Sequence, residues 1–170
     1  PRRADVHLAF LDFQPTPAET SEALGKRCRR VAAVRLPRLV RFARGAWSLL
    51  AGRTATEGCF YCPRLRRIIS RWAADTRFDA VLVFCSSMFQ YARLAALADV
   101  PLVVDLVDVD SQKWFDYAGT ARGIRRRIYQ LEGRRLRQLE IALGRRAKAV
   151  LLVSQAEAQL YRSFCPEAPI

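Results

Sequence analysis

Short apolar runs alternate along the chain with segments in which apolar residues recur every three or four positions. The apolar runs predict strands over residues 6–11, 31–36, 80–85, 101–106 and 149–153. The intervening periodicity predicts helices over residues 18–29, 36–50, 63–76, 86–97 and 122–146, with a last helix from 156. Continuously apolar strands that alternate with helices are typical of a parallel sheet covered on both faces. We therefore predict an α/β fold in which residues 81–85, 102–106 and 150–153 form neighbouring central strands.

Polar side chains follow three of the predicted strands at the point where each strand ends. They are Ser86 and Ser87 after the first, Asp108, Asp110, Ser111 and Trp114 after the second, and Ser154 after the third. Ligands of open α/β sheets bind just outside the carboxyl ends of the strands. The pattern therefore predicts a binding site that these residues share.

Some of these residues also have a structural explanation. Asp110 or Ser111 could cap the N-terminus of a short helix through Trp114 and Tyr117, and one of the two serines after the first strand could cap the helix that follows it. Capping does not explain the charge of Asp108, which lies at the end of the strand itself. The sequence alone leaves both explanations open for the capping candidates.

Other motifs point away from metal and cofactor chemistry. Neither a GxGxxG nor a GxxxxGK[ST] phosphate loop occurs. Cys59 and Cys62 form a single CxxC pair, whereas a zinc site usually needs two such pairs. The only histidine, His7, alternates with apolar residues in a predicted strand, which favours a packed side chain over a catalytic base. We expect no cofactor and no metal site.

The size and composition indicate one domain, or one domain plus a fragment, in a reducing compartment. The chain has 170 residues, of which 51% are hydrophobic, and no apolar run approaches the roughly 18 residues that cross a membrane. The five cysteines are odd in number and irregularly spaced, which favours a cytoplasmic location. The chain opens with Pro1 rather than Met and has no apolar leader, so we expect it to begin inside a longer protein.

The formal net charge of +13 indicates an anionic partner. Nine cations and no acid lie between residues 26 and 53, where the predicted helix 36–50 carries Arg38, Arg41, Arg44 and Trp47. A basic amphipathic helix with a tryptophan is typical of docking on an anionic membrane. An ordinary core-packed helix with a solvated basic face is the alternative.

A basic nucleic-acid-binding module or a non-catalytic interaction domain is a further alternative for the whole chain. However, the aromatic residues do not interleave with the basic runs as nucleobase-stacking platforms would, so we expect no nucleic-acid partner.

Several segments, in this order along the chain, resemble one family. They are residues 83–91, residues 103–114 with Tyr117, residues 132–136, Glu140 and residues 153–157. Together they resemble the sugar transferases of bacterial exopolysaccharide systems associated with PEP-CTERM/EpsH-type export, which belong to retaining glycosyltransferase family four and have the GT-B fold. The resemblance covers residues 78–164 well and earlier residues weakly.

The resemblance implies that residues 1–170 form most of an N-terminal, acceptor-side, Rossmann-like domain. The family's first strand would precede Val6, and its nucleotide-sugar domain would follow Ile170. This implies a fragment that is inactive alone and that could pair with a second copy through exposed strand edges.

For the whole enzyme, the resemblance implies sugar transfer with retention from a nucleotide diphosphate donor to an exopolysaccharide or lipid-linked precursor. It also implies a peripheral location at the inner membrane. Enzymes of this type generally need no metal, so Asp108 and Asp110 are expected to recognise sugar hydroxyls. Trp114 is expected to pack on a sugar face, with hydroxyl contacts from Ser86, Ser87 and Ser111.

Overall fold

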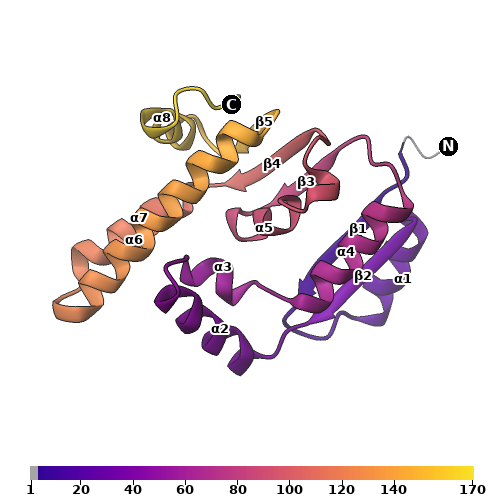
Figure 1. The fold of residues 1–170 in the computed structure, drawn as a ribbon, viewed down its shortest axis with the longest axis horizontal. Coiled ribbons are helices and arrows are strands. Elements are labelled where there is room, and N and C mark those ends of the chain that lie inside the picture. The colour runs from indigo at the N-terminus through magenta and orange to yellow at the C-terminus, as the bar shows by residue number, and fades with distance from the viewer. Residues whose placement is uncertain (1–3) are drawn as a thin grey trace.

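A computed structural model describes residues 4–170 and contains five strands, each parallel to its neighbour (Figure 1). The strands are β1 (His7–Asp12), β2 (Arg30–Arg35), β3 (Val81–Phe84), β4 (Leu102–Val107) and β5 (Ala149–Leu152). They form two sheets, β1-β2 and β3-β4-β5. The predicted strands 81–85, 102–106 and 150–153 are therefore confirmed as parallel neighbours, with β4 in the middle.

The α-helices connect these strands and pack around the sheets. They are α1 (Ala18–Arg27), α2 (Arg38–Leu50), α3 (Ala55–Cys59), α4 (Pro63–Asp75), α5 (Phe89–Ala92), α6 (Asp110–Thr120), α7 (Gly123–Arg146) and α8 (Gln155–Phe164). Short 3-10 turns, η1 (Ser86–Met88) and η2 (Ala95–Leu97), flank α5. The α/β, Rossmann-like fold class predicted from the sequence is confirmed.

The predicted helix over residues 86–97 is wrong in detail, because the structure breaks it into η1, α5 and η2. Leu94 has an extended backbone (ψ 138°) between α5 and η2. The side chains of Leu94 and Leu97 on either side of this break are buried. The one-turn helix α3 was not predicted, because five residues carry too little periodicity to be recognised.

Each sheet has its own core. The larger core lies under β3-β4-β5, where α7 contributes Leu136, Leu139 and Leu143 at helical spacing. The smaller core lies between β1-β2 and α4 and includes Leu65. The Tyr91 hydroxyl joins the two parts, because it accepts a hydrogen bond from the Cys62 amide at 2.8 Å and donates one to the Phe60 carbonyl at 2.7 Å.

The helices leave one face of β3-β4-β5 open among residues 4–170. Leu82 and Val153 are 70% and 71% exposed, and Phe84 and Leu151 on the same face are also exposed. Exposed apolar sheet surface and unpaired strand edges are typical sites of association. The association of two copies through these edges stays a prediction. In the described part of the chain, no helix is both long enough and apolar enough to cross a bilayer.

Candidate functional site

Two strained residues lie where β3 and β4 end. Val107 has φ 66°, and the Asp108 amide donates to the Leu106 carbonyl at 2.8 Å, which closes a tight turn around Val107. Cys85 has φ 68° at the end of β3. Left-handed backbone costs on the order of 1–3 kcal/mol at a residue other than glycine and concentrates at functional sites. Here it turns the chain sharply out of the sheet just before Asp108.

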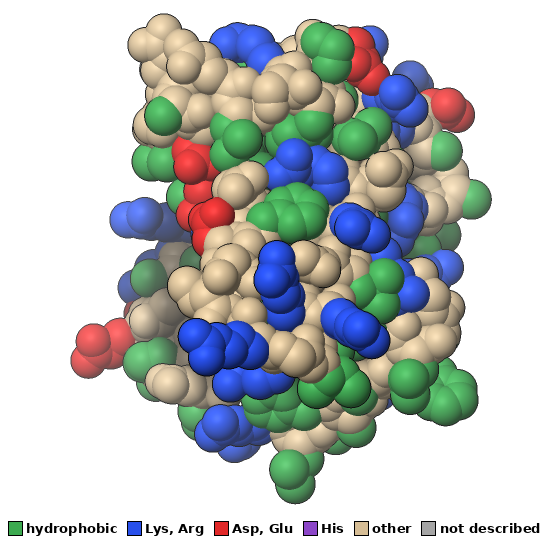
Figure 2. Space-filling view, turned by 90° about the vertical axis from the view of Figure 1, so that its left-hand side faces the viewer, with side chains coloured by type: hydrophobic (Ala, Val, Ile, Leu, Met, Phe, Trp, Pro, Cys, Tyr) green, Lys and Arg blue, Asp and Glu red, His purple; other side chains and the backbone are tan. Residues whose placement is uncertain are grey.

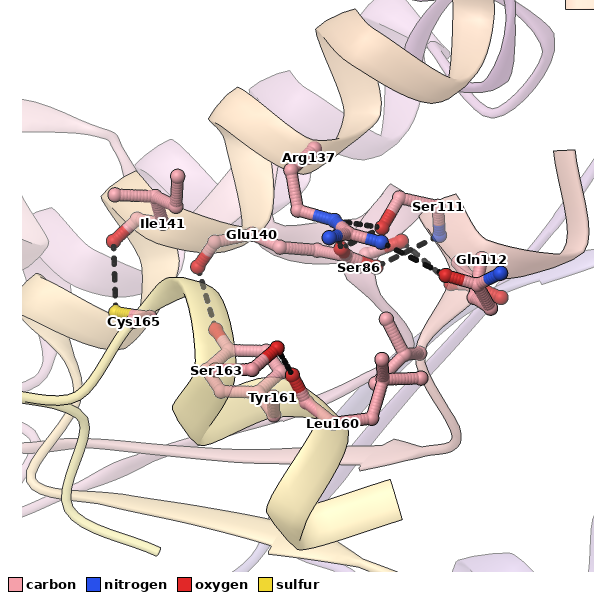
Figure 3. A network of polar contacts seen from close by, with 12 residues as sticks. Ser86, Ser111, Gln112, Arg137, Glu140, Ile141, Leu160, Tyr161, Ser163 and Cys165 are labelled. Atoms are coloured by element: carbon pink, nitrogen blue, oxygen red, sulfur yellow. Dashed lines mark hydrogen bonds and ion pairs between the residues drawn. The ribbon is translucent and has the colours of Figure 1, made fainter. Parts of the chain in front are cut away.

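A buried polar network anchors the first turn of α6 to α7 (Figure 3). The Ser111 amide donates to Glu140 Oε1 at 3.0 Å, and the Ser111 hydroxyl donates to the second carboxylate oxygen. Arg137 Nε donates to Ser111 Oγ at 2.7 Å, while its guanidinium stacks on Phe164. Burial raises the pKa of Glu140 to about 7, although the bonds from Ser111 oppose this shift. The network fixes the position of α6 relative to the sheet.

A second buried contact ties α6 to the end of β3. Ser86 is fully buried, and its hydroxyl donates to Asp110 Oδ2 at 2.6 Å. The other oxygen of Asp110 therefore faces outward, where it contacts Lys113. Ser86 and Ser111 are therefore both buried beneath the accessible surface. Ser86 fixes the position of Asp110, and Ser111 fixes the first turn of α6 to Glu140.

Three charged side chains form the accessible part of the site. Lys113 Nζ lies 2.6 Å from Asp108 Oδ1 and 3.2 Å from Asp110 Oδ1. Burial lowers the pKa of Lys113, but the two carboxylates outweigh it and the pKa is raised overall, so the ammonium stays protonated at neutral pH. Acceptors and donors thus lie side by side, as recognition of a hydroxyl-rich ligand requires.

The structure rejects the capping explanation for the first turn of α6. Its N-cap is Val109, and no side chain caps it. The same holds for η1, whose N-cap is Cys85. Ser154 does cap a helix, because its side chain accepts a hydrogen bond from the Glu157 amide at 3.2 Å in α8. Glu157 in turn accepts from the Val109 amide at 2.7 Å, so the start of α8 lies beside the turn that carries Asp108.

The remaining predicted residues lie further from this turn. Ser87 is buried, and its carbonyl accepts from the Gln90 side chain. Trp114 is half-buried and packs against Tyr117 and Tyr129, with ring centroids 6.0 and 5.4 Å away. A hollow of about 450 Å³ lies next to this aromatic cluster. It is lined by Tyr117, Thr120, Ala121, Arg122, Arg125 and Tyr129.

Sequence reasoning missed Lys113, Arg137 and Glu140 as parts of the site. The spacing of Asp110 and Lys113, three residues apart at a helix start, was the one local signal for the first of them. Arg137 and Glu140 contact Ser111 across 26 and 29 residues of sequence, so no local pattern relates them.

The cysteines and His7 do not supply reactive groups to this site. Burial, together with the neighbouring Asp110 carboxylate, raises the pKa of the Cys85 thiol to about 11. The predicted packing of His7 is confirmed, because it lies edge-on between Trp72 and Phe78 in the first sheet. Cys59 and Cys62 are free thiols. No cluster of metal-ligating side chains occurs within residues 4–170.

The orientation of the basic helix α2 does not fit one of the two interpretations of its sequence, that of a core-packed helix with a solvated basic face. Arg41 stacks on Phe13 at 4.4 Å, and Arg44 Nη1 donates to the Tyr61 carbonyl at 2.6 Å, so both cations point at the protein. Arg38 and Trp47 are exposed. That alternative is therefore wrong, while the anion-binding role of the three arginines stays a prediction.

Comparison with known proteins gives one match. The family described as glycosyl transferase 4-like domain matches residues 1–170, the whole of the chain. The same comparisons found no curated protein and no solved structure that matches the chain. The parallel strands and the helices around them agree with this family assignment. The chain therefore belongs to the glycosyl transferase 4-like domain family.

Proposed function

We propose that the chain is the acceptor-side domain of a retaining glycosyltransferase. The enzyme transfers a sugar from a nucleotide diphosphate donor to an exopolysaccharide or lipid-linked precursor at the inner membrane face. One observation carries the proposal beyond the family match: Asp108, Asp110 and Lys113 meet at the end of the central strand β4. This is the place where open parallel sheets bind their ligands.

Each residue has a distinct role in the proposal. The carboxylates of Asp108 and Asp110 accept hydrogen bonds from sugar hydroxyls, and the Lys113 ammonium donates to a hydroxyl or phosphate oxygen. Ser86 and Ser111 are positioning residues, since they are buried and already bonded to Asp110 and Glu140. Their own predicted contacts with sugar hydroxyls would require these bonds to open.

The uncovered face of β3-β4-β5 supports the proposal that the working enzyme contains more than this domain. Its exposed Leu82, Phe84 and Val153 form an apolar surface of the kind that a further strand–helix unit or domain covers. The nucleotide-sugar site, and with it most of the donor contacts, belongs in a second domain. We therefore expect residues 1–170 alone to be inactive.

Replacing Asp108 by Asn in the complete enzyme tests the site. The change keeps the side-chain shape and removes the negative charge of the carboxylate, which is proposed to accept hydrogen bonds from sugar hydroxyls. We expect kcat/KM for transfer to fall about tenfold or more, equivalent to about 1.4 kcal/mol in the barrier. The melting temperature should stay close to that of the wild type, because Asp108 is partly exposed and contacts a surface lysine.

Asp116→Asn is the matched control. It removes the same charge from the neighbouring helix α6, where Asp116 is exposed and accepts a hydrogen bond from the Gln112 side chain. Its activity should equal that of the wild type. If Asp108→Asn and Asp116→Asn behave alike, or if Asp108→Asn loses its fold before its activity, Asp108 does not contact the sugar.

A further inference from the structure

The apolar face of α2 points into solvent. Leu39, Trp47 and Leu50 are 84%, 74% and 82% exposed, and Phe42 between them is also exposed. Helical spacing places these four residues on one side of α2. Surface helices normally bury their apolar side against the protein. In α2 the apolar side instead faces solvent.

Specific contacts hold α2 in this orientation. Gly45 and Ser48 are buried, and the Ser48 hydroxyl donates to the Thr54 carbonyl at 2.8 Å. Gly58 of α3 lies so close that a Cβ atom there would be 2.4 Å from the Arg44 carbonyl oxygen. The polar side of α2 thus packs tightly on α3. Because the apolar side lies opposite, it faces solvent.

A second apolar stripe on α7 continues this surface. Ile124, Ile128 and Leu131 are exposed and follow each other at helical spacing. The next position of the stripe is Arg135, whose Nη1 donates to the Leu49 carbonyl at 2.6 Å. The stripe therefore runs up to the C-terminal end of α2. Figure 1 shows the first half of α7 at the lower left and α2 at the bottom, just left of the middle.

The surface around these two stripes is basic. Exposed arginines flank the stripes: Arg35, Arg38, Arg53, Arg122, Arg125, Arg126, Arg127 and Arg134. The helix α2 contains no acid, and the only two acids of α7, Glu132 and Glu140, are buried. Figure 2 shows basic and hydrophobic side chains interspersed over the lower part of this face, with acidic side chains toward its margins.

We propose that the outward faces of α2 and the first half of α7 form one docking surface for an anionic lipid bilayer. Apolar side chains enter the interface between headgroups and acyl chains, while the flanking arginines contact lipid phosphates. This deepens the membrane location proposed above and rests on it. The uniform positive charge favours a lipid surface over a second copy of this chain, whose equally basic face would repel it.

The test measures cosedimentation of the protein with vesicles of phosphatidylcholine alone or mixed with phosphatidylglycerol. We expect binding to the mixed vesicles only. The variant with Leu39→Gln, Trp47→Gln and Leu50→Gln should lose about tenfold or more of this binding. The variant with Arg38→Gln, Arg126→Gln and Arg127→Gln should also lose about tenfold or more, and more at low salt than at high salt.

Two matched controls separate docking from general charge and hydrophobicity. Leu82→Gln with Val153→Gln removes equally exposed apolar side chains from the sheet face, and Arg66→Gln, Arg67→Gln and Arg71→Gln removes three charges from α4. Both should bind mixed vesicles like the wild type.

The proposal would be overturned if all variants bound the mixed vesicles equally. It would also be overturned if the wild type bound phosphatidylcholine vesicles but not the mixed ones. A wild-type dimer that the α2 variant dissociates, without vesicle binding, would assign the surface to a second copy. Vesicle binding needs no sugar, and Asp108→Asn should dock like the wild type. Failure of docking is thereby distinguished from failure of the proposed sugar transfer.

Discussion

Replacing Glu132 by Ala is expected to lower the free energy of unfolding by about 3 kcal/mol or more. Glu132 of α7 is buried and accepts three hydrogen bonds from the start of α3. The donors are the Ala55 amide at 2.7 Å and the amide and hydroxyl of Thr56, both at 2.8 Å. Alanine would leave two backbone amides and a hydroxyl without their partner, and each buried donor left unpaired costs about 1–3 kcal/mol.

Urea unfolding followed by circular dichroism measures this loss. Glu167→Ala is the control, because Glu167 also ties another segment to α7, through Arg145 at 2.7 Å, but on the surface. Exposed ion pairs contribute little, so this variant should unfold near the wild-type midpoint. Comparable losses in the two variants would show that the junction of α3 and α7 does not depend on Glu132.

The second large effect is a change of stability with pH that depends on Glu140. Burial raises the pKa of this carboxyl from its ordinary 4.5 to about 7 in the folded chain. Between these two values the folded state holds a proton that the unfolded state has released. The free energy of unfolding contributed by Glu140 therefore falls as pH rises through this range, by about 3 kcal/mol in total.

Glu140→Gln removes this titration and keeps a side chain of the same shape beside Ser111. The difference in unfolding free energy between variant and wild type should shift in favour of the variant by about 3 kcal/mol between pH 4 and pH 8. Urea unfolding at intervals across this range measures it. A difference that stays constant with pH would show that Glu140 ionises in the folded protein as it does in the unfolded one.

The sequence predicted the parallel sheet because the strands β3, β4 and β5 are buried on at least one face and carry continuous apolar runs. It also placed Asp108 and Asp110 at the carboxyl end of the central strand, since both follow such a run immediately. These features depend on local pattern and on one topological rule, both of which can be followed along the chain.

The orientation of α2 could not be predicted in this way. Its periodicity defines an apolar side and a basic side, but not which of them faces the protein. The close packing of α2 on α3, at Gly45 of one helix and Gly58 of the other, decides this, and α3 was not predicted. Likewise, the hydrogen bonds of Ser111 could not be predicted, because their acceptor, Glu140, lies 29 positions away in the sequence.

Nucleoside diphosphate release by the full-length protein tests the central claim most directly. The protein is incubated with a panel of nucleotide diphosphate sugars, with and without a phosphate-bearing lipid acceptor, and the released nucleotide is quantified. The account predicts release that requires one donor and the acceptor together, with a product that retains the anomeric configuration of the donor. No release from any donor, combined with tight sequence-independent binding of DNA, would contradict it.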